Sequence, residues 1–109
     1  PLGPVTREDD PAWTGLVRWV LYGLIDAEER GVDSASAKAA AKEELVSLGK
    51  PAATALGLAD DWLAATVGAV GNYGEVFARN LGEDTPLGLT RGLNALWTEG
   101  GLLYAPPLQ

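Results

Sequence analysis

The sequence contains no cysteine, no histidine and no methionine. These absences remove the thiol nucleophile, the general base that works near neutral pH, and the soft or imidazole ligands of transition metals. Ser34, Ser36 and Ser47 therefore have no histidine to activate them, and no glycine-rich loop combines with a lysine in a phosphate-binding spacing. We expect a protein that is not an enzyme, with no catalytic residue, no metal site and no cofactor.

Basic residues are also scarce. Eight Lys and Arg stand against fifteen Asp and Glu, and the net charge of −7 disfavours nucleic acid and anionic membranes as partners. No apolar run approaches the roughly 18 residues of a membrane-spanning helix, yet 47% of the residues are hydrophobic, which is typical of one soluble, folded unit. The first residues carry no Met and no basic segment before an apolar one, so we expect a piece of a longer protein without its signal peptide.

Helical signals dominate what is present. Asp10 and Pro11 form an N-cap and first helical position, and apolar residues recur at helical spacing from Trp13 to Ile25, which predicts a helix that ends near Gly31. The preceding residues are extended, and Val5 to Arg7 resemble the end of a strand without a neighbour.

A second helix is expected after Asp33 or Ser34 and is stopped by Gly49 and Pro51. Its alanines bury little area, so it should pack peripherally and weakly. Residues 50–59 are then a connection with at most one short turn.

A third helix is predicted over residues 61–81, with Asp60 as its cap. Gly68, Gly71 and Gly74 lie inside it, and each costs about 1 kcal/mol relative to Ala. Two explanations stay open, close approach of another backbone or a local break that shapes a contact surface.

A fourth helix is predicted from Leu87 to about Glu99, with Thr85 as cap, Pro86 at its start, and an extended tail after Gly100. Four of its side chains should face inward: Leu89, Leu93, Leu96 and Trp97. The predicted fold class is therefore all-α, with about four helices, an extended N-terminal arm and an extended C-terminal tail.

Acidic pairs and aromatic residues are the remaining candidates for function. The pairs Asp9-Asp10 and Asp60-Asp61 precede helices and are expected to cap them, whereas Glu28-Glu29 and Glu43-Glu44 are expected on solvated faces. The aromatic residues exceed what so small a core can enclose, so some should meet a partner. These residues are Trp13, Trp19, Trp62, Trp97, Tyr22, Tyr73 and Tyr104.

Three blocks carry a resemblance to a known family: PLGPVTREDD at residues 1–10, GNYGEVFARNLG at 71–82 and RGLNALWTEGGLLYAPP at 91–107. They resemble the carboxyl-terminal portion of a general L-amino-acid-binding periplasmic protein, a type 2 solute-binding protein of an ABC importer. The resemblance implies that residues 1–109 are a single helical unit of a larger, periplasmic, two-lobed α/β protein. It places the ligand contacts in other segments, so no ligand-binding residue is assigned here.

The same resemblance sets the expected partners. These are the remaining lobes of the parent protein and, through the parent, an L-amino acid and an ABC permease; a homodimer of the isolated piece is a further expectation, because its apolar surface is left uncovered. The alternative that the residues leave open is a stand-alone helical protein–protein interaction module. A small enzyme would instead need carboxylates gathered in a cleft with a shifted pKa.

Overall fold

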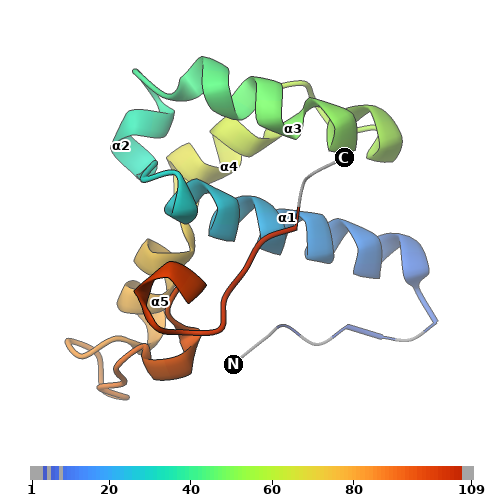
Figure 1. Ribbon diagram of the computed structural model, residues 1–109. Helices are drawn as coiled ribbons and strands as arrows, with labels where there is room; N and C mark the ends of the chain where they lie inside the picture. Colours follow the sequence, from blue (N-terminus) through green and yellow to red (C-terminus); the bar gives the residue numbers. More distant parts are fainter. Residues whose placement is uncertain (1–3, 5, 8, 107–109) are drawn as a thin grey trace.

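The computed structural model describes residues 4, 6–7 and 9–106, and within these ranges the chain is helical with no strand (Figure 1). Helix α1 (Pro11–Glu29) is the longest element. The Asp10 side chain accepts a hydrogen bond from the Trp13 backbone N–H at 3.1 Å, which confirms the predicted N-cap. The arm before it is not a strand at Thr6 and Arg7, and Val5 lies outside the described residues.

The second predicted helix is wrong in its bounds. It is divided into the single turn α2 (Ser34–Ala37) and the longer α3 (Lys42–Leu56), which runs through both Gly49 and Pro51. Proline removes one backbone hydrogen bond from a helix, but α3 continues because Leu45, Ala52 and Ala53 are buried along it. The expected connection over residues 50–59 is therefore mostly helix, and α3 packs centrally rather than weakly.

The third predicted helix contains a break. Helix α4 (Trp62–Val70) ends at Gly71, whose φ of +94° is accessible to glycine, and α5 (Tyr73–Leu81) begins after the N-cap Asn72. Asp60 does not cap α4, since its N-cap is Asp61 and no side-chain hydrogen bond is made there. Of the two explanations for the glycines, the local break describes Gly71.

The fourth predicted helix is wrong. Residues 82–106, which we call the C-terminal segment, form turns and two 3-10 turns, η1 (Gly92–Asn94) and η2 (Trp97–Glu99). Gly88 and Gly92 adopt positive φ and interrupt the helical spacing of the leucines. A single parallel bridge joins Leu96 to Leu103, and the Trp97 N–H donates to the Leu103 carbonyl at 2.8 Å. Leu96 is buried as predicted, but Leu89, Leu93 and Trp97 are exposed.

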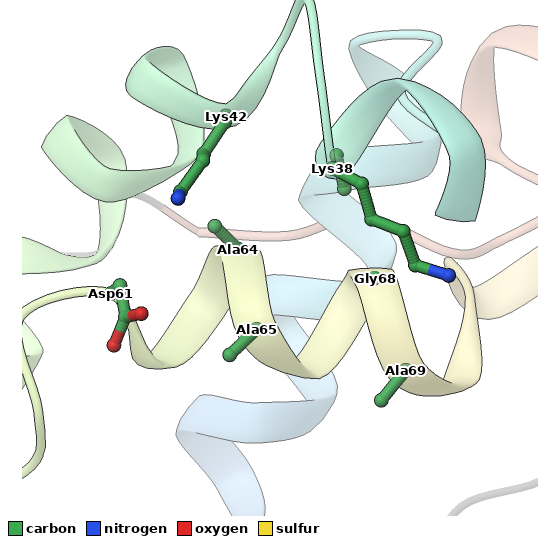
Figure 2. A pocket seen from close by; sticks show the side chains of 8 residues that line it. Lys38, Lys42, Asp61, Ala64, Ala65, Gly68 and Ala69 are labelled. Carbon is green, nitrogen blue, oxygen red and sulfur yellow. The ribbon is translucent and has the colours of Figure 1, made fainter.

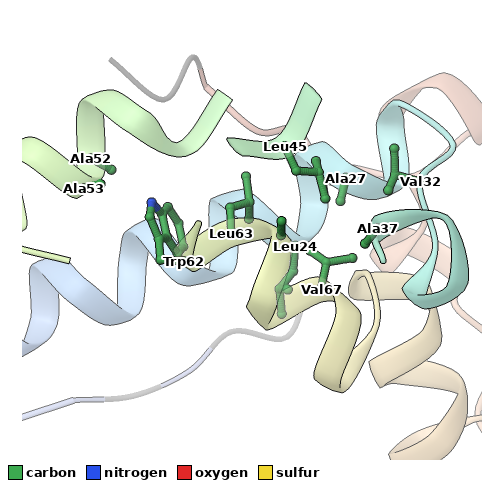
Figure 3. Close-up of a cluster of buried hydrophobic side chains, with 11 residues drawn as sticks. Leu24, Ala27, Val32, Ala37, Leu45, Ala52, Ala53, Trp62, Leu63 and Val67 are labelled. Atoms are coloured by element: carbon green, nitrogen blue, oxygen red, sulfur yellow. The ribbon is translucent and has the colours of Figure 1, made fainter. Parts of the chain in front are cut away.

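The main core lies between the carboxyl half of α1 and helices α2, α3 and α4, which together we call the helical core (Figure 3). Leu45, Leu63 and Val67 are fully enclosed. The Trp62 indole N–H donates to the Gly49 carbonyl at 2.7 Å, so the absence of a side chain at Gly49 lets α4 approach α3 closely.

A second, smaller cluster fixes the C-terminal segment. Its buried residues are Ile25 of α1 with Leu96, Leu103 and Ala105 of the segment. The described residues contain four helices of nine residues or more, so the predicted all-α class with about four helices is confirmed. Within the same residues no helix is both long and apolar enough to cross a membrane.

Candidate functional site

The acidic pairs do not gather into a catalytic or metal-binding cluster in the part of the chain that the structure describes. Asp10 caps a helix as expected, but Glu28 and Glu29 are not on a solvated face. Glu29 accepts the Ala105 backbone N–H at 3.1 Å, from a residue 76 positions away along the chain. Both glutamates therefore hold the C-terminal segment against the end of α1.

Glu28 forms a bidentate, largely buried ion pair with Arg91. Arg91 Nη2 donates to Glu28 Oε1 at 2.8 Å, and Arg91 Nη1 donates to Glu28 Oε2. The guanidinium also lies over two rings, 5.5 Å from the Tyr73 centroid and 5.9 Å from that of Phe77. Contact with a carboxylate and with ring faces favours the charged form. Hydrogen bonding to Glu28 accordingly raises the pKa of Arg91, and burial raises the pKa of the Tyr73 hydroxyl.

Gly74 makes this ion pair possible. A Cβ at this position would collide with the Glu28 carboxylate and lie 3.0 Å from Arg91 Nη1. Close approach, the other explanation offered for the spaced glycines, therefore describes Gly74, although the neighbours are side chains rather than backbone. Arg91 Nε is buried with no hydrogen-bond partner among the described atoms, so the guanidinium relies on its other two nitrogens.

Glu75 ties two helix starts together. Its carboxylate accepts the Asn72 N–H at 3.0 Å, the Ser34 N–H at 2.9 Å and the Ser34 hydroxyl at 2.8 Å. Asn72 Nδ2 in turn donates to the Val32 carbonyl at 2.8 Å. Burial by itself would raise the pKa of Glu75, but these hydrogen bonds to Asn72 and Ser34 hold it below its usual value.

A shallow hollow of about 400 Å³ lies where α2 and α3 cross α4 (Figure 2). Lys38 and Lys42 reach over it from one side, Asp61 stands at its end, and its floor consists of Gly68 and alanine side chains of α4. The three charged residues are exposed, and the floor offers no side-chain hydrogen-bonding group. An amino acid held by protein needs buried, convergent polar groups, which the lining residues do not supply.

Apolar side chains form two further surfaces, of which the first is made of exposed residues. One is the C-terminal patch, in which Trp97 and Tyr104 meet edge to face at 6.4 Å and Leu93 and Leu102 accompany them, each more than half exposed. Trp13 is 54% exposed at the start of α1, whereas Trp62 is buried. The prediction that part of the aromatic surface remains uncovered is thus confirmed for Trp13, Trp97 and Tyr104.

The other surface is an apolar groove between α1 and α5, which we call the α1–α5 groove. One cavity of about 200 Å³ is lined mainly by Leu21 and by Tyr73, Val76, Phe77 and Leu81 of α5. A second cavity of about 250 Å³ continues along α1, where Val17 and Tyr22 line it. Leu21 and Pro4 line both, so the two cavities adjoin, although the second lies between α1 and the arm and is partly polar.

Known proteins share this sequence and this fold. No family model matches, but the chain is 44% identical over its whole length to the general L-amino acid-binding periplasmic protein AapJ of Rhizobium johnstonii. It is 44% identical to the glutamate/glutamine/aspartate/asparagine-binding protein BztA of Rhodobacter capsulatus, and 41% to the putative amino-acid ABC transporter-binding protein YhdW of Escherichia coli. In each case the chain spans 34% of the relative's length.

A solved structure shows the same arrangement. It is an ABC transporter periplasmic binding protein from Brucella ovis with glutathione bound, 39% identical, with a TM-score of 0.81 over 95% of this chain and 35% of that one. The chain is therefore a portion of a periplasmic binding protein, the class whose fold has two lobes. Within that class it matches the amino-acid-binding proteins, and the predicted resemblance to their carboxyl-terminal portion is confirmed. These relatives are solute-binding proteins and not enzymes, as expected.

The residues that sequence reasoning missed are Glu28, Arg91 and Glu75. Glu28 and Arg91 are 63 positions apart, and no local pattern connects them. Glu75 did have a signal, because Asn72 followed three residues later by Glu75 is the spacing of a capping box. That spacing, directly after a glycine, was sufficient to locate the start of α5.

Proposed function

We propose that residues 1–109 are a single helical unit, the carboxyl-terminal part of a periplasmic amino-acid-binding protein that delivers L-amino acids to an ABC permease. The observation that carries this proposal is the match along the whole chain to about one third of AapJ, BztA and YhdW. The unit is structural. Its partners are the remaining lobes and, through them, the amino acid and the permease.

The geometry supports a structural role in two ways. The hydrogen-bonded carboxylates of Glu28, Glu29 and Glu75 are occupied in joining segments of the chain to one another. The hollow at Lys38 and Lys42 has exposed charges and a floor of small side chains. A ligand cleft in a two-lobed protein lies between the lobes, so one piece of one lobe lacks half of the contacts.

A chimera tests the proposal. In AapJ, the third that aligns with this chain is replaced by residues 1–109, and binding of a panel of L-amino acids is measured by calorimetry. We expect the chimera to bind amino acids within about 10-fold of AapJ, since most contacts come from the retained part. Removal of the aligned third without replacement is the control that should abolish folding. A folded chimera without amino-acid affinity contradicts the proposal.

The chain alone should show no heat of binding with L-amino acids. A micromolar or tighter affinity, about −8 kcal/mol, would contradict a purely structural role. In that outcome Lys42→Ala and Asp61→Asn decide whether the hollow is the site, with Lys50→Ala on the exposed face of α3 as the matched control.

The isolated chain should form a homodimer through surface that the parent protein would cover. Both the C-terminal patch and the α1–α5 groove expose apolar area, and covering it contributes about 25 cal/mol per Å². The charge of −7 opposes association, but salt at 0.1 M screens it beyond about 10 Å, so added salt should strengthen the dimer. Sedimentation at two salt concentrations measures this, and a strict monomer at high protein concentration would favour a self-sufficient interaction module.

A further inference from the structure

We propose that the C-terminal patch is a self-association surface, against which the same patch of a second copy of this chain packs about a twofold axis. This inference rests on the proposed function and deepens the homodimer expected there, because it names the surface and the residues at its centre. Eight large hydrophobic side chains are exposed among the described residues, and six of them belong to the C-terminal segment. These six are Leu87, Leu89, Leu93, Trp97, Leu102 and Tyr104.

The backbone fixes the patch on the outer side of the segment. Buried and exposed residues alternate along residues 102–105, as successive side chains of an extended chain do. Leu103 and Ala105 are buried against Ile25 of α1, whereas Leu102 and Tyr104 point to the opposite side. Because the inner side is already filled, the outer side chains stay in water unless another molecule covers them.

The four side chains of the patch are contiguous. The single parallel bridge of the segment sets Trp97 beside Tyr104, and their rings meet edge to face with centroids 6.4 Å apart. The Leu102 N–H donates to the Leu93 carbonyl at 2.9 Å, which holds these two residues next to each other. The patch is therefore one surface held by backbone hydrogen bonds, and its two aromatic residues are of the types that contribute most binding energy in protein interfaces.

The charge distribution favours a second copy over a partner of opposite charge. Residues 85–109 contain two charged residues, Arg91 and Glu99, so the whole net charge of −7 is carried by residues 1–84. Arg91 is moreover engaged in its bidentate ion pair with Glu28. A strongly basic or acidic partner would find few charges to pair with on this surface. A twofold contact places the surface against itself, where depletion of charge is the composition of an interface core.

The exposed area is of the size that a dimer needs. The four side chains of the patch are each more than half exposed and together offer on the order of 500 Å². A standard interface covers about 800 Å² on each partner, so the patch supplies the larger part of one side. Leu87 and Leu89 of the same segment add to the exposed apolar area. The α1–α5 groove offers less, because none of its lining side chains is among the exposed large hydrophobics.

Sedimentation of single variants tests the surface. Trp97→Ala removes the largest side chain of the patch, and Trp13→Ala, at the start of α1, is the matched control because the two tryptophans are 56% and 54% exposed. The Kd of the dimer is measured for residues 1–109 and for each variant, and circular dichroism shows that the helical fold is retained. We expect Trp97→Ala to raise the Kd by about 30-fold or more and Trp13→Ala to change it by less than about 3-fold.

A cross-link gives a second readout. The chain has no cysteine, so Leu102→Cys places a single thiol in the patch, and Ser47→Cys, on the exposed side of α3, places one outside it. A short bis-maleimide should join two copies at Leu102→Cys and not at Ser47→Cys, because a twofold contact brings the same surface of both copies together. An unchanged Kd in Trp97→Ala, equal cross-linking of the two thiols, or a strict monomer would each overturn the inference. Amino-acid binding by the AapJ chimera tests the proposed function separately, so either proposal can fail without the other.

Discussion

Leu45, Leu63 and Val67 in the helical core are fully enclosed, whereas the C-terminal segment leaves Trp97 and Tyr104 more than half exposed. The helical core is held by packing of helix against helix. The segment is held by the Glu28–Arg91 ion pair, backbone hydrogen bonds and a small cluster around Ile25. The two regions should therefore respond to different kinds of substitution, the first to changes of volume and the second to changes of charge.

The largest effect is expected at the centre of the helical core. Leu63→Ala removes a side chain with no exposed surface and leaves a cavity, which should lower the free energy of unfolding by about 3 kcal/mol. Leu102→Ala in the C-terminal segment is the matched control, because Leu102 is 57% exposed and should cost less than about 0.5 kcal/mol. Urea denaturation measures both. Equal losses would show that the two regions are packed alike.

Adding volume should also distinguish packed from open positions. A Cβ at Gly49 would lie 2.8 Å from Trp62 Nε1 and 2.9 Å from the Leu63 Cβ, so Gly49→Ala should destabilise by about 2 kcal/mol despite the better helix propensity of Ala. Gly15→Ala in α1 has nothing within 4 Å of the new Cβ, and should stabilise by up to about 1 kcal/mol. The sign of each change in thermal midpoint is the readout. A stabilising Gly49→Ala would contradict the close approach of α4.

Charge should matter most for the C-terminal segment. Glu28→Gln leaves the partly buried Arg91 without its counter-ion and should loosen the segment by about 1 to 2 kcal/mol. Hydrogen exchange locates the effect: the Leu102 and Leu103 amides, bonded to the Leu93 and Ala95 carbonyls, should exchange faster. In Glu28→Gln, the amides of α4 should keep their protection from exchange. Glu43→Gln, at the exposed start of α3, is the control and should leave the protection of all amides unchanged. Uniform loss of protection would mean that both regions unfold together.

The smallest effect is expected from pH, at the carboxylate that links α2 to α5. The folded-state pKa of Glu75 is lowered, so its contribution to stability is complete above the ordinary carboxyl pKa and is lost as pH falls through the lowered value. Glu75→Gln should therefore flatten the decline in unfolding free energy on acidification, by less than about 1 kcal/mol. Urea unfolding at several pH values between neutral and acid tests this. An unchanged slope would show that the carboxylate gains no stability from its three hydrogen-bond donors.

Much of the helical content was predictable because it is encoded locally. The Asp10 cap, the periodic apolar positions of α1 and the Asp33 cap of α2 each lie within a few residues of the structure they specify. Pro51 was wrongly predicted to end a helix. The burial of Ala52 and Ala53 against other helices outweighs the one hydrogen bond that proline removes, and this packing cannot be recognised from the neighbouring sequence.

The C-terminal segment was wrongly predicted to be a helix, because there the local pattern indicates a helix that the fold does not form. Leu89, Leu93 and Leu96 repeat at a helical spacing, but Gly88 and Gly92 adopt positive φ and the leucines face different ways. The α1–α5 groove could not be predicted either, because its residues are far apart in the sequence. Excess aromatic residues indicated an uncovered surface, whereas the groove depends on α1 and α5, which are separated by the three helices between them.

The hydrogen bonds from Asn72 to Val32 and from Ser34 to Glu75 bring together two points about 40 positions apart. Residues 35–71, which include α3 and α4, therefore form a stretch whose two ends are hydrogen-bonded to each other beside α1 and α5. When the two ends of a stretch are fixed next to each other, a residue inserted at an exposed turn inside the stretch does not displace the ends. Among homologues, length should vary most freely at the largely exposed turn of residues 57–61 within this stretch, because α3 and α4 on either side of it form the helical core. The Glu28–Arg91 ion pair, by contrast, holds the C-terminal segment at the end of α1.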